Sequence, residues 1–146
     1  MAVIDKYSAV ERAFSAAKQI KEHADFLAAT SGSINFNILR GRLDAMRDHY
    51  LNGISPLLAL GNAAAINPVI ASLYAGTLPA NPYTQMQALG TALTALYTGY
   101  GDIFATLTPV TFSVANGHAY ANIPLVQLQT LGDELSAVIA AVTPLV

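Results

Sequence analysis

The sequence predicts a mainly α-helical bundle of about four main helices and one short helix, with a small β-hairpin (about 111–121) before the C-terminal helix. Two observations lead to this fold class. Apolar residues recur every three or four positions over long stretches, which is the spacing of one helix face. Proline, glycine and asparagine residues separate these stretches and mark where helices begin and end. The 146 residues suit one core, so we expect a single helical domain over 1–146.

The first helix is predicted over residues 8–29. Ser8 and Glu11 match a capping box, in which each side chain accepts a hydrogen bond from a backbone N–H at the helix start. Gly32 follows the last apolar position and supplies a stop. The positions expected to be buried are Val10, Phe14, Ala17, Ala24 and Leu27.

The second helix is predicted from about Asn35 to Leu60, and Pro56 should kink or end it near Ser55. A short helix from about 68 to 75 should follow, because Asn67-Pro68 places a capping residue before a proline at the first helical position. The apolar stripe of the second helix is Phe36, Leu39, Leu43, Met46 and Tyr50.

Asn81-Pro82 repeats the same start signal and opens the clearest predicted helix, from Pro82 to about Thr106. Its apolar residues alternate between spacings of three and four, which suits packing of one helix on another. These residues are Met86, Leu89, Leu93, Leu96, Tyr100, Ile103 and Leu107.

The periodicity changes after this helix. Residues 111–114 alternate polar and apolar side chains, as a half-buried strand does. Asn116-Gly117 favours a tight hairpin turn, and residues 118–120 would return antiparallel. Pro124 then opens the last predicted helix, over about 125–142. Its apolar stripe is Leu128, Leu131, Leu135, Val138 and Val142.

The charged residues are few and lie mostly at one end of the chain. Apolar residues make up 53% and charged residues 11%, against roughly 25% charged in a typical soluble domain. Thirteen of the sixteen charged residues fall within 1–48, and residues 49–101 hold none. The surface of a soluble monomer normally carries charged side chains of both signs, and this stretch has almost none. We therefore expect other subunits to cover the charge-poor part, 49–146.

The alternative is that a membrane, and not another subunit, buries the charge-poor stretch. A spanning helix needs about 20 mostly apolar residues. The window 54–75 is interrupted by two prolines and two asparagines, and the window 88–110 holds five threonines and Asp102. We therefore expect no transmembrane span, and the mixed charges at the start of the chain do not resemble a signal peptide. A membrane-associated amphipathic helical protein remains an alternative.

No pattern in the chain indicates catalysis, a cofactor or a metal. Cysteine is absent, and His23, His49 and His118 are not spaced to share a helix face. No Glu-x-x-His pair, Gly-x-Ser-x-Gly elbow or Gly-rich phosphate loop occurs. The formal charge of -2 argues against a nucleic-acid partner. We expect a protein that is not an enzyme and that acts through protein–protein contacts.

Two groups of residues are the candidates for such contacts. The arginines 40, 42 and 47 form the one concentrated basic feature, although Asp44 and Asp48 could make it an ordinary solvated helix face. Tyrosine is common at interfaces, although core packing is the usual alternative. A third reading is a small-molecule-binding helical bundle, in which Tyr97, Tyr100 and nearby glycines line a cavity. The interaction candidates are Arg40, Arg42, Arg47, Tyr74, Tyr83, Tyr97 and Tyr120.

The segment Ser33–Asn52, SINFNILRGRLDAMRDHYLN, and the C-terminal order of hairpin, Ile123-Pro124 and apolar helix resemble small virion structural proteins of tailed bacteriophages. The resemblance extends over most of the chain. It implies a multi-copy homo-oligomer in the head, neck/connector or tail of a bacteriophage virion, assembled in the cytoplasm of the bacterial host. It implies copies of itself and other virion proteins as partners, and no catalytic residues.

Overall fold

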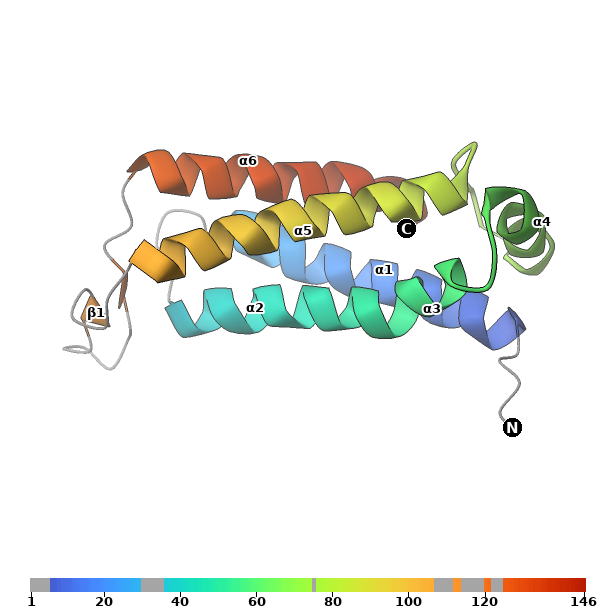
Figure 1. The fold of residues 1–146 in the computed structure, drawn as a ribbon, viewed down its shortest axis with the longest axis horizontal. Coiled ribbons are helices and arrows are strands. Elements are labelled where there is room, and N and C mark those ends of the chain that lie inside the picture. The colour runs from blue at the N-terminus through green and yellow to red at the C-terminus, as the bar shows by residue number, and fades with distance from the viewer. Residues whose placement is uncertain (1–5, 30–35, 75, 107–111, 114–119, 122–124) are drawn as a thin grey trace.

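The computed structural model describes residues 6–29, 36–74, 76–106, 112–113, 120–121 and 125–146, with side-chain surroundings for 7–29, 40–74, 76–98 and 132–146. The long helices run lengthwise, each opposite in direction to the one before it along the chain (Figure 1). They are α1 (Lys6–Ala29), α2 (Phe36–His49), α5 (Pro82–Thr106) and α6 (Leu125–Val142). Since α1 contacts α2 and α6, and α5 contacts α6 and α2, the four helices close around one core. The predicted mainly α class is confirmed.

The shorter elements lie near the ends of this bundle. They are η1 (Tyr50–Ile54), α3 (Ser55–Leu58), α4 (Ala63–Leu73) and the 3₁₀ turn η3 (Thr143–Leu145). α4 is turned across one end of the bundle, whereas β1 (Phe112–Ser113) lies at the other end (Figure 1).

The core is built from the apolar stripes that the sequence predicts, wherever their side chains are described. All five predicted positions of α1 are buried, as are the described stripe residues of the other three long helices, except Tyr50, which is half-buried. No polar or charged side chain is buried among these residues. The stripe residues concerned are Leu43, Met46, Met86, Leu89, Leu93, Leu96, Leu135, Val138 and Val142.

Two predicted helix starts are wrong. α1 already contains Lys6, so Ser8 lies within the helix and does not cap it. α4 begins at Ala63, where the Asn62 side chain accepts a hydrogen bond from the Ala65 N–H, and Pro68 lies inside the helix. Pro68 is the sixth residue of α4, beyond the first turn, so α4 lacks the hydrogen bond that an N–H at this position would donate to the carbonyl of Ala64.

Asn67 instead joins two helices. Its side-chain oxygen accepts from the Tyr83 N–H at 2.9 Å, and its amide nitrogen donates to the Asn81 side chain at 2.8 Å. Asn81 also accepts from the Thr84 N–H at 3.0 Å, which confirms it as the cap of α5. The two Asn-Pro signals therefore differ, since one caps a helix and the other fixes α4 against the start of α5.

The second predicted helix widens before its proline instead of ending there. Pro56 has no N–H to donate, and its ring crowds the carbonyl four residues earlier. The helix accommodates Pro56 through the π-helical turn η1, in which the Ser55 N–H donates a hydrogen bond to the Tyr50 carbonyl oxygen five residues earlier. Gly53, within this turn, is buried against α1. A Cβ at position 53 would lie 2.5 Å from the Ala16 Cβ and 3.0 Å from the Arg12 carbonyl oxygen.

The predicted β-hairpin over about 111–121 requires a correction. The described part of this stretch contains two strands of two residues each, β1 (Phe112–Ser113) and β2 (Tyr120–Ala121), which pair antiparallel. Asn116 and Gly117 lie outside the described residues. Two-residue strands without further sheet have little independent stability. The fold class is therefore mainly α, without a hairpin among its architectural elements.

Candidate functional site

The three arginines of α2 do not form one basic patch. Positions 42 and 47 are five residues apart, which places them about 140° apart around a helix. Arg42 contacts α1, whereas Arg47 contacts α5. Arg40 is exposed, with its Nε 3.9 Å from the Asp44 carboxylate. Each arginine therefore has a different neighbour within the chain.

Arg42 belongs to a cluster of aromatic rings between α1 and α2. Its guanidinium carbon lies 3.9 Å from the centre of the Phe26 ring. Its Nη1 donates to the Nδ1 of His23 at 2.9 Å. The His23 ring in turn stacks on His49, with centres 5.7 Å apart. Because arginine can only donate, His23 must accept at Nδ1 and carry its proton on Nε2.

This cluster favours the neutral form of His23. Burial lowers the pKa of His23 below its ordinary value of 6.5, and electrostatic interactions with Arg42 and His49 lower it further. The charged groups that act on this ring are Arg42 and His49 of α2 and Glu22 of α1, and only Glu22 raises the pKa. A second proton on His23 would also remove the acceptor for Arg42.

His23→Gln is expected to reduce the loss of stability on acidification. Because the pKa of folded His23 lies below 6.5, the unfolded chain takes up this proton more readily. The contribution of neutral His23 is complete above 6.5 and is lost as the pH falls toward the lowered folded pKa. Urea unfolding of both proteins at about pH 7.5 and about pH 5.5 measures how much stability each one loses. Most carboxyl groups titrate below this pH range, so they contribute little to the loss. An equal loss in both proteins contradicts this assignment.

Arg47 connects α2 to α5 through Tyr97. Its guanidinium carbon lies 4.7 Å from the centre of the Tyr97 ring, and its Nη1 donates to the Tyr97 hydroxyl at 3.2 Å. That hydroxyl donates to the Asp44 carboxylate at 3.1 Å. The face of α2 that carries Arg40, Asp44 and Arg47 therefore borders the charge-poor half of the molecule.

The other tyrosine candidates also have neighbours within the chain. The Tyr74 ring stacks on Phe14, with centres 3.9 Å apart. The Tyr83 hydroxyl lies 3.1 Å from the Gly61 carbonyl oxygen and donates to it. Tyr120 lies in β2, and its side chain is outside the described surroundings. Tyr74 and Tyr83 are half-buried, so only part of each ring faces outward.

Hollows lie on both sides of the α2–η1 segment. One, of about 440 Å³, lies against α1 and is lined by both acidic and basic residues, such as Glu11, Arg12 and Asp48. The other side holds a hollow of about 250 Å³ between η1 and α5, where Arg47 and Tyr97 meet Tyr50 and Gly90. Among the described residues, no group of three or more His, Asp or Glu side chains could hold a metal ion.

Tyr50 and Gly90 form a close contact that the sequence analysis did not identify. The Tyr50 hydroxyl donates to the Met86 carbonyl oxygen at 3.3 Å. A Cβ at position 90 would overlap that hydroxyl and would lie 2.6 Å from the Tyr50 Cζ. Burial raises the pKa of Tyr50. A glycine in the middle of a helix lowers helix stability by about 1 kcal/mol relative to alanine. The presence of Gly90 within a predicted helix was therefore the signal in the sequence that could have indicated a close contact.

The α5 outer face is an exposed and uncharged surface. Its residues recur at helical spacing over about 20 Å of the helix. Thr91 and Thr94 donate their hydroxyl protons to carbonyls one turn back in α5, at 3.2 and 2.8 Å. The residues of this face are Thr84, Gln87, Ala88, Thr91, Thr94, Ala95 and Thr98.

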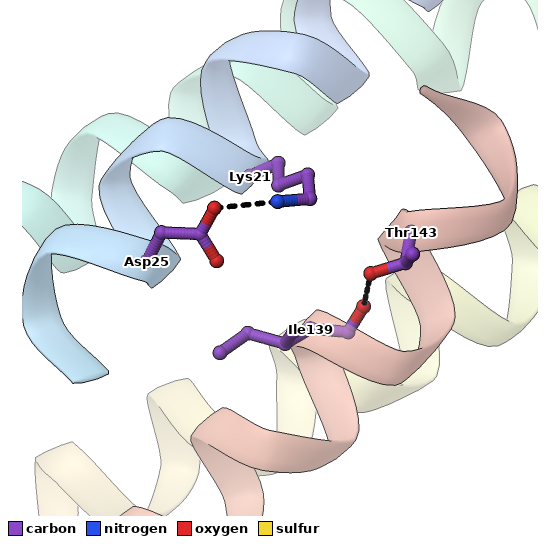
Figure 2. A network of polar contacts seen from close by, with 4 residues as sticks. All are labelled: Lys21, Asp25, Ile139 and Thr143. Carbon is purple, nitrogen blue, oxygen red and sulfur yellow. Dashed lines mark hydrogen bonds and ion pairs between the residues drawn. The ribbon is translucent and has the colours of Figure 1, made fainter. Parts of the chain in front are cut away.

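Thr143 shows the same arrangement at the end of α6. Figure 2 shows its hydroxyl bonded to the Ile139 carbonyl oxygen, at 2.6 Å, across from the Lys21–Asp25 ion pair of α1. A threonine whose proton is used in this way presents its methyl group with no unsatisfied donor. The α5 outer face can therefore be covered without leaving the Thr91 or Thr94 proton unpaired.

No single helix among the described residues is long and apolar enough to cross a membrane. Arg40–Leu58 and Ala63–Leu73 reach that length and composition only together, as a pair bent by 106°. No protein-family model, curated protein or solved structure matches this chain.

Proposed function

We propose that this chain is a non-enzymatic structural subunit, which assembles with copies of itself through the α5 outer face. The observation that supports this proposal most strongly is the absence of charge from that face, at seven exposed positions on one long helix. Small side chains there, such as Ala88 and Ala95, permit another helix to approach closely.

The charge distribution favours a second copy as the occupant of this face. Two identical faces that carry charge of one sign repel when they meet about a two-fold axis, and the α5 outer face has no charge that would cause such repulsion. A partner with charged residues would leave those charges unpaired when they are buried here. The charged groups of α1 and α2 are then left to face water in the assembly.

The finer proposal is a multi-copy subunit of a bacteriophage virion, in the head, neck/connector or tail. Its support is the resemblance of Ser33–Asn52 to small virion proteins. Other virion proteins would then be further partners, and the bacterial host cytoplasm would be the place of assembly. Mass spectrometry of purified particles tests this proposal, because it should find the chain in many copies per particle.

Ala95→Lys is expected to weaken self-association by about 2 kcal/mol or more, because it buries an unpaired ammonium group. Ala95 is exposed in the subunit, so folding should be little affected. Ala28→Lys, at an exposed position of α1, is the matched control and should assemble like the wild type. Sedimentation velocity measures both variants. Unchanged association of Ala95→Lys contradicts the proposed face.

A further inference from the structure

The hollow between η1 and α5 has a mostly apolar lining, to which Arg47, Thr94 and Thr98 add polar groups. Its volume is about 250 Å³, below the 300–1,000 Å³ that is typical of sites for larger ligands. Leu51 and the buried Leu93 supply aliphatic lining, and Tyr50 and Tyr97 supply aromatic rings. A space of this size suits one ring or one branched aliphatic group.

The shape of the hollow depends on a specific backbone feature. Tyr50 can lie against α5 only because position 90 has no Cβ, as described above. The bond from the Tyr50 hydroxyl to the Met86 carbonyl oxygen then fixes the ring. One wall of the hollow is therefore held by α5 itself.

Of the described residues that line this hollow, Arg47 is the one that carries a charge. No carboxylate among the described residues forms an ion pair with it. Its ring contact and its single hydrogen bond to Tyr97 hold the guanidinium beside the hollow and use one of five N–H donors. Asp44, the nearest acid in this network, accepts from Tyr97 and lies 3.9 Å from Arg40. Arg47 thus keeps donors for an external anion.

We infer that this hollow binds a small amphipathic carboxylate, with its apolar body against Leu93 and Tyr50 and its carboxylate on Arg47. Guanidinium and carboxylate groups match in geometry and charge, which makes arginine a good partner for this head group. A neutral head group would lack this charge-assisted hydrogen bond, and the guanidinium would repel a cationic one. Thr94 and Thr98 line this hollow and also belong to the α5 outer face, so the test includes a variant that should not self-associate.

The test uses phenylacetate and its neutral analogue phenylacetamide in ligand-detected NMR titrations. Phenylacetate should bind about tenfold or more tightly than phenylacetamide, because only the acid forms a charge-assisted bond. Arg47→Gln should remove this preference and leave phenylacetamide binding unchanged. Arg40→Gln alters a neighbouring arginine of α2 that does not line the hollow, so it should keep the preference.

The titrations are repeated on Ala95→Lys, which leaves the lining of the hollow unchanged. Preferential phenylacetate binding in either protein that Arg47→Gln abolishes supports the site. Three results overturn it: no binding to either protein, equal binding of acid and amide, or an acid preference that survives Arg47→Gln. Failure of self-association would change none of these readouts, so the two proposals are tested separately.

Discussion

Ile20→Ala is expected to lower the free energy of unfolding by about 2–5 kcal/mol. Ile20 lies in α1 with none of its side chain exposed. α1 contacts α2, η1 and α6, so the removed atoms leave a cavity at the centre of the bundle. Urea unfolding followed by circular dichroism measures the change at a fixed protein concentration, because self-association would contribute to stability.

Two variants make this result interpretable. Ile20→Val removes one carbon and should cost about 0.5–1.5 kcal/mol. Leu60→Ala alters a side chain that is 37% exposed and should cost less than about 1 kcal/mol. A loss for Ile20→Ala no greater than that for Leu60→Ala contradicts the position of α1 in the core.

Gly53→Ala is expected to destabilise the protein by about 1–3 kcal/mol through overpacking. The added Cβ would meet the Ala16 Cβ at 2.5 Å and the Arg12 carbonyl oxygen at 3.0 Å. One of these neighbours is a backbone atom and the other is a Cβ held close to the backbone of α1. Neither can move unless α1 and η1 separate, so the strain cannot be relieved by a side-chain rotation. Thermal unfolding reports the loss.

Gly41→Ala is the matched control. Gly41 lies in α2, is exposed, and a Cβ there would meet nothing within 4 Å. The substitution should raise stability by up to about 1 kcal/mol, because alanine favours the helix. If Gly53→Ala also raises stability, then α1 and η1 do not approach each other as described.

The long helices could be predicted because their signal is repeated many times. Met86, Leu89, Leu93 and Leu96 each place an apolar residue on the same side of α5, and all four are buried. A single misleading residue changes little in such a pattern. The positions of the buried stripes therefore followed from the sequence wherever their side chains are described, apart from the half-buried Tyr50.

Two predictions that depended on a short signal of two or four residues were wrong. Asn67-Pro68 looks like a helix start, but Asn67 bonds the Tyr83 N–H and Asn81 instead. Ser8 and Glu11 match a capping box, although α1 is already helical at Ser8. In these cases a tertiary contact or a longer helix competes with the local signal.

The candidate site could be predicted only in part. Helical spacing alone separates Arg42 from Arg47 around α2, but it does not identify His23 and Tyr97 as their partners. Those contacts depend on which helices are neighbours in the bundle. The contact between Tyr50 and Gly90 depends in addition on the π-helical turn before Pro56.

We propose that the charge-free α5 outer face joins copies of this chain. Native mass spectrometry of the wild-type protein across a micromolar concentration series tests it most directly. We predict a defined mass that is a multiple of the 15.3 kDa subunit, with dissociation on dilution. A single 15.3 kDa species at the highest concentration would contradict the claim.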